Sequence, residues 1–563
     1  MPNKEELLKI LLNNRGIKIE DQDKFLNPSY EDGLYNPFLL KDMEIAVVRI
    51  FEAVEANEKV IIYSDYDADG IPAAVIMYDF FEKIGFKNFV VYIPDRHDEG
   101  YGLNMEAIKE FIDNSINLII TFDLGITDIN EVVEAKANNI DVIIVDHHLP
   151  IEENEKDILP NAFAIIDPKR KDCSYPDKML CGAGVAFKLI QALILKYGEY
   201  WKINNGWGKW LLDMAGIATL SDQVPLLNEN RVIAYFGLKV LRKSKRQGLL
   251  ELWKKNKIDL KNISEEDITF TLTPRINVAS RMANPMIAFE LLSEKDSIKA
   301  KIVSDILEKI NSERKVSVAH IMKDVKHTLS KRFETEDYEK NPFILIGNPK
   351  WHIGVLGIIA SKIVDEYKKP VFVWGGEDDI IRGSCRGYGE INLVKIMTSL
   401  PDNFLIDFGG HKMAGGFSIN KKEIYFLEEK LQNVFQAQNN EEEFNEEEII
   451  DSEINIDDVN MDNYKIIEKL APFGVGNPKP TFLLKNIPIF SVKEFGKEKN
   501  HLELGFKNDK GRIIKAIAFF KTRCDFFIEQ DLIEGKNIDM IATFEKSNFL
   551  GKEELRLRIV KIL

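Results

Sequence analysis

The chain has 563 residues, of which 45% are hydrophobic and 29% are charged. These fractions are those of an ordinary globular protein and exclude wholesale disorder. At roughly 100–200 residues per domain, the length predicts about three domains. The formal net charge of −16 by itself argues against a nucleic-acid-binding protein. However, eleven acids fall between Leu431 and Tyr464, a stretch without Lys or Arg, and subtracting them leaves −5 for the rest of the chain.

The sequence gives no sign of a membrane-bound or secreted protein. No apolar run approaches the ~18–20 residues that span a bilayer, and the first residues, Met1–Glu6, lack the basic region and apolar core of a secretory signal. The four cysteines form no CxxC pair, so they indicate neither a disulfide framework nor a zinc site. We therefore expect a cytoplasmic protein with reduced thiols and no membrane contact.

The N-terminal half of the chain repeats one pattern: a short β-branched run, a polar turn and a helical segment. The runs are Val60–Tyr63, Phe89–Ile93, Leu118–Phe122, Val142–Val145 and Ala164–Ile166. Near-continuous apolar runs of this length are typical of strands buried on both faces, as in a parallel sheet. Helical segments such as Pro72–Ile84 and Ile129–Asn138 separate the runs. The alternation predicts an α/β domain with a doubly wound parallel sheet.

The pattern changes after this region. From Ile287 to about Arg332, apolar residues recur at three- and four-residue spacing, which predicts a long connector helix. A second, smaller α/β domain is expected next, with strands at Phe343–Ile346 and Val371–Trp374 and a helix over Gly354–Tyr367 between them.

Short alternating runs follow the acidic stretch, which we interpret as a linker or a charged domain edge. They include Phe482–Leu484, Ile487–Val492, Leu502–Phe506 and Ile514–Phe519, and they predict a small, OB-like β-barrel. The expected domains are therefore 1–285 (N-terminal region and parallel-sheet domain), 286–335 (helical connector), 336–438 (smaller α/β domain) and 439–563 (acidic linker and barrel).

Acids and histidines gather at the predicted strand ends. Asp65, Asp67 and Asp69 follow the first run at alternate positions. Asp123 follows the run that ends at Phe122, and Asp146-His147-His148 follows the run that ends at Val145. Ligands of open parallel sheets bind beyond the carboxyl ends of the strands, so these side chains are expected at one rim. A further acid, Asp222, follows the apolar helix predicted over Trp210–Leu220.

This combination of residues predicts a metal site. Several Asp with one or two His and no Cys favour manganese or magnesium over structural zinc. So many carboxylates ionise together only when cations compensate them. Two metals about 3.5–4 Å apart would do so and would activate water for phosphoryl displacement. A single strand-end Asp is more often a helix N-cap, and the calcium-loop alternative lacks its Glu, because position 76 is Ile.

At this point the sequence resembles the DHH phosphoesterase family, which is named for the triplet seen at Asp146–His148. Asp65–Gly70, Asp123–Gly125 and Ser221–Leu226 are similar to further motifs of that family. Within it, the chain resembles the single-strand-specific 5′-to-3′ DNA exonucleases of bacteria. The segments that carry this closer resemblance are Pro94–Asn104, Cys181–Phe187, Pro274–Arg281, Trp351–Ser361, Gly409–Gly415 and Pro472–Pro478.

The resemblance implies a DHH catalytic domain, a connector helix, a DHH-associated domain and an OB-like barrel, and it implies roles for individual residues. Two divalent cations, manganese or magnesium, would be bound by Asp67, Asp69, Asp123, His147, His148 and Asp222. Asp65 and Asp146 would be supporting acids, and Gly409, Gly410 and His411 would lie across the cleft near the scissile phosphate. The 5′-terminal phosphate would be held by Arg96, Ser384 and Arg386, and the DNA backbone by Arg275 and Arg281.

The function implied is hydrolysis of single-stranded DNA from its 5′ end, with release of 5′-mononucleotides, in DNA repair and recombination. A helicase and a single-strand-binding protein are the expected partners, and the protein is expected to be a monomer. The chain departs from the usual family pattern at Ser221–Pro225 and at Gly383–Gly387. The predicted ligand Asp222 and the predicted phosphate donors Ser384 and Arg386 are kept in both segments.

Two features leave alternatives open. Lys239–Lys257 carries eight basic residues against one acid, Glu251, and is either a funnel for single-stranded DNA with Trp253 stacking on a base, or a solvated helical face with Trp253 in the core. The barrel binds either DNA or a protein. Two rival functions are a phosphodiesterase for short oligonucleotides or cyclic dinucleotides, and a catalytically inactive scaffold. The barrel and connector argue against the first, and the complete ligand set argues against the second.

Overall fold

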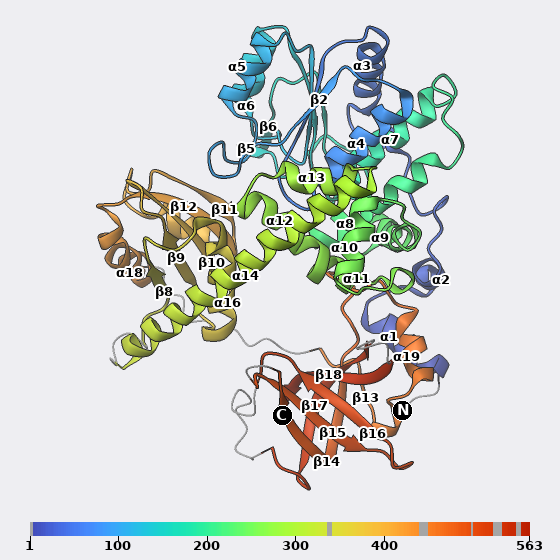
Figure 1. Cartoon of the computed structure of the whole chain (residues 1–563), viewed down its shortest axis with the longest axis vertical. Coiled ribbons are helices and arrows are strands. Elements are labelled where there is room, and N and C mark those ends of the chain that lie inside the picture. The colour runs from blue at the N-terminus through green and yellow to red at the C-terminus, as the bar shows by residue number, and fades with distance from the viewer. Residues whose placement is uncertain (1–3, 335–339, 438–448, 497–498, 522–531, 548–552) are drawn as a thin grey trace.

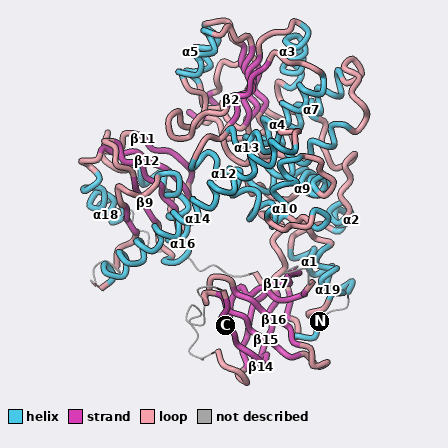
Figure 2. Tube along the Cα trace, viewed as in Figure 1, coloured by secondary structure: helices cyan, strands magenta, loops and turns pink. Residues whose placement is uncertain are grey.

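The computed structural model describes residues 4–334, 340–437, 449–496, 499–521, 532–547 and 553–563. Its parts are a large α/β domain, a smaller α/β domain carried by a long helix, and a C-terminal barrel that lies next to the N-terminal helix (Figure 1). Among the described residues, the strands form three large sheets and one two-stranded hairpin, and helices dominate the region between the large sheets (Figure 2). The predicted fold class is confirmed by this architecture.

The large domain is built on a five-stranded parallel sheet with the order β2-β1-β3-β4-β7. Its strands are β1 (Val60–Ser64), β2 (Phe89–Tyr92), β3 (Leu118–Phe122), β4 (Asp141–Val145) and β7 (Ala164–Ile166). Every residue of β1 and β3 is buried, as expected for strands covered on both faces. A small exposed hairpin, β5 (Ile151–Glu153) and β6 (Lys156–Ile158), follows β4.

Helices cover both faces of this sheet. Ile61 and Tyr63 of β1 pack on the face of α5 (Met105–Asp113) and α6 (Ile129–Ala137). Val60 and Ile62 point to the opposite face and pack with three other helices. These are α3 (Met43–Glu55), α4 (Gly70–Ile84) and α7 (Gly182–Tyr197). This alternation along the strand places both helix layers against one sheet.

A helical region completes the domain and leads to the connector. Its helices are α8 (Leu212–Ser221), α9 (Asn228–Leu241), α10 (Gln247–Lys255), α11 (Glu265–Asp267), the π-helical turn η5 (Ile268–Leu272), α12 (Thr273–Met282) and α13 (Met286–Ser293). The expected continuous helix from Ile287 is wrong in its first part, because α13 ends and α14 (Ser297–Phe333) begins anew. The carboxylate of Asp296 caps α14 by accepting hydrogen bonds from the amides of Ile298 and Lys299.

The smaller α/β domain has a five-stranded sheet with the order β11-β12-β10-β9-β8. Only β8 and β9 are parallel, and the other neighbouring pairs are antiparallel. Its strands and helices are β8 (Ile344–Gly347), α16 (Leu356–Tyr367), β9 (Val371–Gly375), β10 (Ile380–Arg386), α17 (Leu393–Thr398), β11 (Asp407–His411), β12 (Ala414–Asn420) and α18 (Leu427–Ala437). The edge strand β11 pairs with β12 alone and is exposed along its length.

The barrel strands have the order β14-β15-β16-β18-β17, and β17 also pairs with β14, which closes the sheet as in an OB fold. The elements are β13 (Ser452–Glu453), α19 (Met461–Glu468), β14 (Phe482–Phe495), β15 (His501–Lys507), β16 (Ile513–Ala518), β17 (Asn537–Ser547) and β18 (Glu554–Ile562). The two strands expected over Phe482–Val492 are one long strand with register irregularities near Asn486 and Phe490. Much of the acidic stretch, 438–448, lies outside the described residues.

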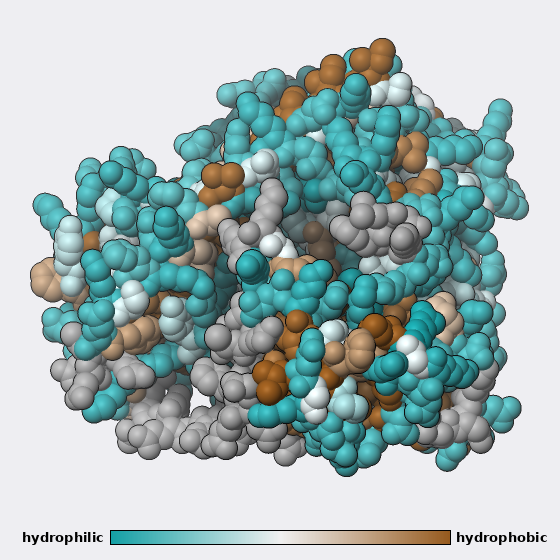
Figure 3. Space-filling view, turned by 60° about the horizontal axis from the view of Figure 1, so that its bottom comes forward, coloured by the Kyte–Doolittle hydropathy of each residue, from teal (hydrophilic) through white to brown (hydrophobic). Residues whose placement is uncertain are grey.

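The N-terminal helix α1 (Lys4–Asn14) belongs to the barrel core although it lies more than 400 residues away in sequence. Leu7, Leu11 and Leu12 are buried in the same hydrophobic cluster as the barrel strands. A short helix, α2 (Gln22–Leu26), follows. Seen from the barrel side, the surface is mainly hydrophilic, with several separate hydrophobic patches (Figure 3). Among the described residues, no helix combines the length and hydrophobicity needed to cross a membrane.

Candidate metal centre and substrate cleft

Four aspartates line up at the carboxyl edge of the parallel sheet. Asp65, Asp123, Asp146 and Asp167 each follow the last residue of a strand. The register aligns these strand ends, because Phe122 pairs with both Ser64 and Val145, and Val145 with Ile166. The amides of the first three aspartates donate to the last carbonyl of the neighbouring strand at 2.9–3.2 Å. The expected rim of acids is therefore present.

The loop between β1 and α4 folds around its own carboxylates. Oδ1 of Asp67 accepts hydrogen bonds from the amides of Asp69 (2.7 Å) and Gly70 (3.1 Å). The buried carboxylate of Asp69 accepts from the amides of Gly182 (2.6 Å) and Ala183 (2.7 Å), at the N-terminus of α7. These contacts hold two of the predicted ligands toward the sheet edge.

Asp146 organises the two histidines. Its Oδ1 accepts hydrogen bonds from the amides of His147 (2.7 Å) and His148 (3.2 Å) and from Nδ1 of His148 (2.8 Å). Burial opposes ionisation, but these donors and the charge of His148 lower the pKa of Asp146 to about 2. Burial likewise opposes the charge of His148, but its bond to Asp146 raises its pKa to about 9. Asp146 is thus saturated with donors, as suits a supporting acid.

His147 presents a lone pair to the carboxylates. Its Nδ1 lies 3.0 Å from the carbonyl oxygen of Leu180, which can only accept, so Nδ1 carries the hydrogen. Burial and the neighbouring His148 lower the pKa of His147 to about 3, so its ring is neutral. The unprotonated Nε2 faces Oδ1 of Asp123 at 3.1 Å and Oδ2 of Asp69 at 3.6 Å. A cation bound between these atoms would satisfy all three.

The structure gathers all six predicted metal ligands into three overlapping groups. In each group, one potential ligand atom per residue lies within 4.8 Å of the others. The groups are Asp123 with His147 and His148, Asp69 with His147 and Asp222, and Asp65 with Asp67 and Asp123. Oδ1 of Asp65 and Oδ1 of Asp123 are buried and accept no hydrogen bond. A shared Asp123 and a shared His147 fit a centre with more than one cation.

The electrostatics of the metal-free site are unfavourable. Burial, together with the neighbouring Asp67, raises the pKa of Asp65 and brings that of Asp69 to about 6. Burial and Asp69 raise the pKa of Asp123, and burial with Asp69 and Asp67 raises that of Asp222 to about 8. Carboxylates that resist ionisation for lack of positive charge are the donor set that a hard divalent cation stabilises.

Sequence reasoning missed two residues at this edge. Asp167 is fully buried after β7, and its Oδ2 has no hydrogen-bond partner. Burial and Asp146 raise its pKa to about 8. The signal was present, because Asp167 follows a predicted strand just as Asp123 does. The second residue, Tyr101, donates its hydroxyl to the carbonyl of Asp123 (3.1 Å) and lies 3.2 Å from Nδ1 of His148.

Three of the predicted substrate-binding arginines converge beside the acids. Burial and the charges of Arg96 and Arg386 lower the pKa of Arg281 to about 10, and Asp67 partly offsets this. The guanidinium of Arg96 lies 5.1 Å from the ring centroid of Tyr66. Arg386 donates from Nη1 to Oγ of Ser384 at 3.2 Å. Within the described residues, no ion pair joins these three guanidinium groups to an acid, so together they suit an anion.

Arg275 lies apart from this group. It is buried, and its Nε donates to Glu308 of α14 at 2.6 Å, while Nη1 donates to the carbonyl of Thr271 at 2.7 Å. Its Nη2 also donates to Asn256. The structure therefore gives Arg275 internal partners, so its predicted contact with the DNA backbone would require these bonds to be exchanged.

A cleft separates the two α/β domains. It encloses a cavity of about 900 Å³ whose walls are Tyr66 and Arg96–Gly100 on one side and β10, β11 and β12 on the other. Gly409 lines this cavity, and Gly410 and His411 follow it along the exposed edge strand β11. Within the described part of the chain, no hydrogen bond or ion pair joins His411 to the acids of the rim.

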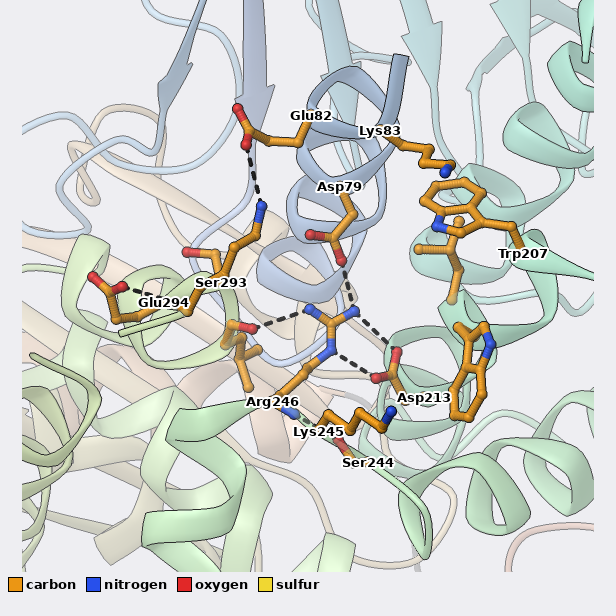
Figure 4. A pocket seen from close by; sticks show the side chains of 14 residues that line it. Asp79, Glu82, Lys83, Trp207, Asp213, Ser244, Lys245, Arg246, Ser293 and Glu294 are labelled. Carbon is orange, nitrogen blue, oxygen red and sulfur yellow. Dashed lines mark hydrogen bonds and ion pairs between the residues drawn. The ribbon is translucent and has the colours of Figure 1, made fainter. Parts of the chain in front are cut away.

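Two basic residues of the segment Lys239–Lys257 make internal contacts. Arg246 donates to Asp79 (2.7 Å) and Asp213 (2.6 Å) in a pocket at the C-terminal end of α4 (Figure 4). Lys255 pairs with Asp305 at 2.7 Å. Trp253 is 2% exposed and belongs to the core, so the stacking alternative for this residue is wrong.

Family models match three separate parts of the chain: the DHH family N-terminal domain at 59–219, the DHHA1 domain at 340–441 and the RecJ OB domain at 450–561. The chain is 32% identical over 555 residues to the single-stranded-DNA-specific exonuclease RecJ of Bacillus subtilis, covering 98% of this chain and 67% of that protein. It is 30% identical over 541 residues to the exonuclease RecJ of Haemophilus influenzae, covering 93% and 91%.

Two solved structures have a similar fold. The crystal structure of RecJ from Thermus thermophilus in complex with Mn²⁺ matches with a TM-score of 0.78 at 24% identity, over 99% of this chain and 76% of that chain. A crystal structure of exonuclease RecJ bound to manganese matches with a TM-score of 0.61 at 27% identity, over 71% and 95%. With its three domain matches and these relatives, the chain belongs to the RecJ family of single-stranded-DNA-specific exonucleases.

Proposed function

We propose that this protein is a single-strand-specific DNA exonuclease that hydrolyses phosphodiester bonds with two divalent cations, manganese or magnesium. The observation that carries the proposal is the neutral Nε2 of His147 facing Oδ1 of Asp123 at 3.1 Å, a pair of ligand atoms that a divalent cation would bind together. The similar proteins are single-stranded-DNA-specific exonucleases, which supplies the substrate class.

We assign the metal-binding role to six residues, each of which belongs to at least one of the three groups described above. These are Asp67, Asp69, Asp123, His147, His148 and Asp222, with Asp65 and Asp146 as supporting acids. Divalent cations bound there would supply the positive charge that activates a water molecule and stabilises the phosphoryl oxygens. Asp146 orients His148 through the bond to Nδ1, so its Nε2 remains available as a ligand.

A 5′-to-3′ polarity follows from assigning the arginine group to a terminal phosphate. The guanidinium groups of Arg96 and Arg386 can each donate two parallel hydrogen bonds to an anion, and the hydroxyl of Ser384 can donate one. A strand anchored there by its 5′ phosphate would place the next phosphodiester at the rim of acids, and cleavage would release a 5′-mononucleotide. Gly409, Gly410 and His411 would contact the strand from across the cleft, and Arg281 its backbone.

We further infer a cytoplasmic, monomeric enzyme that acts in DNA repair and recombination. The buried free thiols of Cys173, Cys181 and Cys385 suit a reducing compartment. An enzyme restricted to single strands depends on other proteins for its substrate, so a helicase that opens duplex DNA and a single-strand-binding protein are the proposed partners.

The test is digestion of long single-stranded DNA labelled at the 5′ or the 3′ end, with manganese, magnesium or chelator. We expect the 5′ label to be released first as a mononucleotide, only with metal present, and faster from a 5′-phosphorylated strand. Asp123→Ala should abolish cleavage but keep binding of the phosphorylated strand. Cleavage in chelator, or equal loss of both labels, would refute the proposal. Faster turnover of dinucleotides than of long strands would favour the rival phosphodiesterase.

A further inference from the structure

An exposed aromatic residue lies close to the Asp222 side of the metal centre. Phe270 is 74% exposed, although it sits in a segment whose neighbours Ile268 and Leu272 are fully buried. It is presented by the π-helical turn η5 between α11 and α12. Such turns are rare and recur at functional sites. Core packing therefore explains Ile268 and Leu272 but leaves Phe270 without a role.

Hydrogen bonds connect this turn to the residue that precedes Asp222. The hydroxyl of Thr273 donates to the carbonyl of Ile268 (3.0 Å) across η5, and it lies 2.6 Å from the hydroxyl of Ser221. After Asp222, Gln223 adopts a left-handed conformation with a φ of 58°, and its side chain is exposed. The position of Phe270 is thus tied to the end of α8, where the predicted ligand lies.

A cavity of about 460 Å³ lies between Phe270 and the end of α8. Its walls are the end of α8, the π-helical turn and the loop 473–479 ahead of the barrel. Most of the lining side chains are apolar, including Phe270, Leu226 and the half-exposed Val475. The cation in the lining, Lys479, already pairs with Glu266. The cavity therefore suits a flat, uncharged ring better than a phosphate group.

We propose that Phe270 is a base-stacking residue for single-stranded DNA, on which a nucleobase packs as the strand leaves the metal centre past Asp222. The inference rests on the proposed function for the identity of the strand. The occupant is inferred from the position of the cavity beside the acids, because its lining includes the residues on both sides of Asp222, and Asp222 belongs to one of the candidate metal-binding groups. Stacking on an aromatic ring tolerates every base, as an exonuclease requires.

The first test compares Phe270→Ala with wild type in the presence of manganese. We expect KM for a long single strand to rise about tenfold, with kcat little changed, and the kinetics on a dinucleotide too short to reach Phe270 to stay the same. Phe270→Trp should restore the low KM. The matched control is Tyr425→Ala, which removes another highly exposed aromatic side chain, 81% exposed, from the smaller domain. An unchanged KM for the long strand in Phe270→Ala would overturn the proposal.

The second test separates this inference from the proposed function. Equilibrium binding of a long oligonucleotide is measured with Asp123→Ala and with Asp123→Ala/Phe270→Ala, so that no cleavage is needed. Weaker binding by the double variant supports stacking even if the enzyme cleaves no strand. So does quenching of the emission of the added tryptophan when the oligonucleotide binds to Phe270→Trp. Equal binding by both variants assigns Phe270 to another partner, such as a protein, and overturns the proposal.

Discussion

Nε2 of His147 and Oδ1 of Asp123 face each other at 3.1 Å, while Nδ1 of the same histidine ring faces the carbonyl oxygen of Leu180. The ring is neutral and gives its one hydrogen to Leu180, so the lone pair on Nε2 faces the carboxyl group of Asp123 in a buried site. When Asp123 is ionised, this contact is repulsive in the free protein, which agrees with the raised pKa of Asp123, and a cation that accepts both lone pairs makes it favourable. The metal-free protein is thus destabilised at the point where its chemistry is proposed to occur.

Asp123→Asn tests this destabilisation directly. The amide group can donate a hydrogen bond to Nε2 of His147 and carries no charge, so the metal-free variant should be more stable than wild type by about 1 kcal/mol. Manganese at a hundredfold excess over its Kd should stabilise the wild type by about 2.7 kcal/mol and so raise its Tm. It should raise the Tm of the variant much less. Thermal unfolding with chelator and with metal measures both effects. A variant less stable than wild type in chelator would contradict the assignment.

Gly182→Ala should damage the metal centre without unfolding the domain. A Cβ at this position would lie 2.6 Å from Oδ1 of Asp123, so the added methyl group must displace that carboxylate. We expect the metal affinity to fall by roughly 10–100-fold. Gly184→Ala is the matched control on the same turn of α7, because its Cβ would meet only ordinary contacts at 3.5 Å or more. Metal titration of both variants measures this loss of affinity. Equal metal affinities of Gly182→Ala and Gly184→Ala would rule out the proposed role of Asp123.

Asp167→Asn should change how stability depends on pH in the metal-free protein. Burial and Asp146 raise the pKa of Asp167 from an ordinary 3.8 to about 8. As the pH rises between these values, the unfolded state loses its proton while the folded state keeps it, so the contribution of Asp167 to stability decreases. The variant should lack this decrease and gain about 1–3 kcal/mol over wild type at neutral pH. Urea unfolding of both proteins at pH 5 and pH 8 measures this difference. The same change in the free energy of unfolding between the two pH values in both proteins would contradict the pKa shift of Asp167.

The metal rim could be predicted because its signals are local. Buried parallel strands appear as short apolar runs, and the residue after each run lies at the carboxyl edge, which placed Asp65, Asp123 and Asp146 correctly. Tertiary pairing is not local. The sequence pattern does not indicate that Arg246 is held by Asp79 and Asp213, which lie far from it in the chain. The break before α14 depends on a single cap at Asp296, which an apolar periodicity does not reveal.

Two neighbouring glycines of β11 distinguish substrate contact from backbone geometry. A Cβ added at Gly409 would meet no atom within 4 Å, so Gly409→Ala should fold with an unchanged Tm. If the strand passes across this cleft as proposed, the methyl group should still raise KM for single-stranded DNA. Gly410→Ala should instead lower the Tm, because Gly410 has a φ of 139° and its Cβ would lie 2.3 Å from the carbonyl of Ala414. A Gly409→Ala enzyme with wild-type KM would remove this glycine from the proposed substrate contacts.

Leu11→Ala should destabilise the barrel and spare the metal centre, because α1 completes the barrel core from the other end of the sequence. Leu11 is fully buried among barrel residues such as Leu470 and Phe482. Its truncation should cost about 2–5 kcal/mol, which we expect to appear in calorimetry as an earlier unfolding transition for the barrel. Metal affinity and cleavage of dinucleotides should remain, because the acids of the rim lie in a different core. Lys9→Ala, on the exposed face of the same helix, is the control. A loss of metal binding in Leu11→Ala would show instead that the barrel and the catalytic domain unfold as one unit.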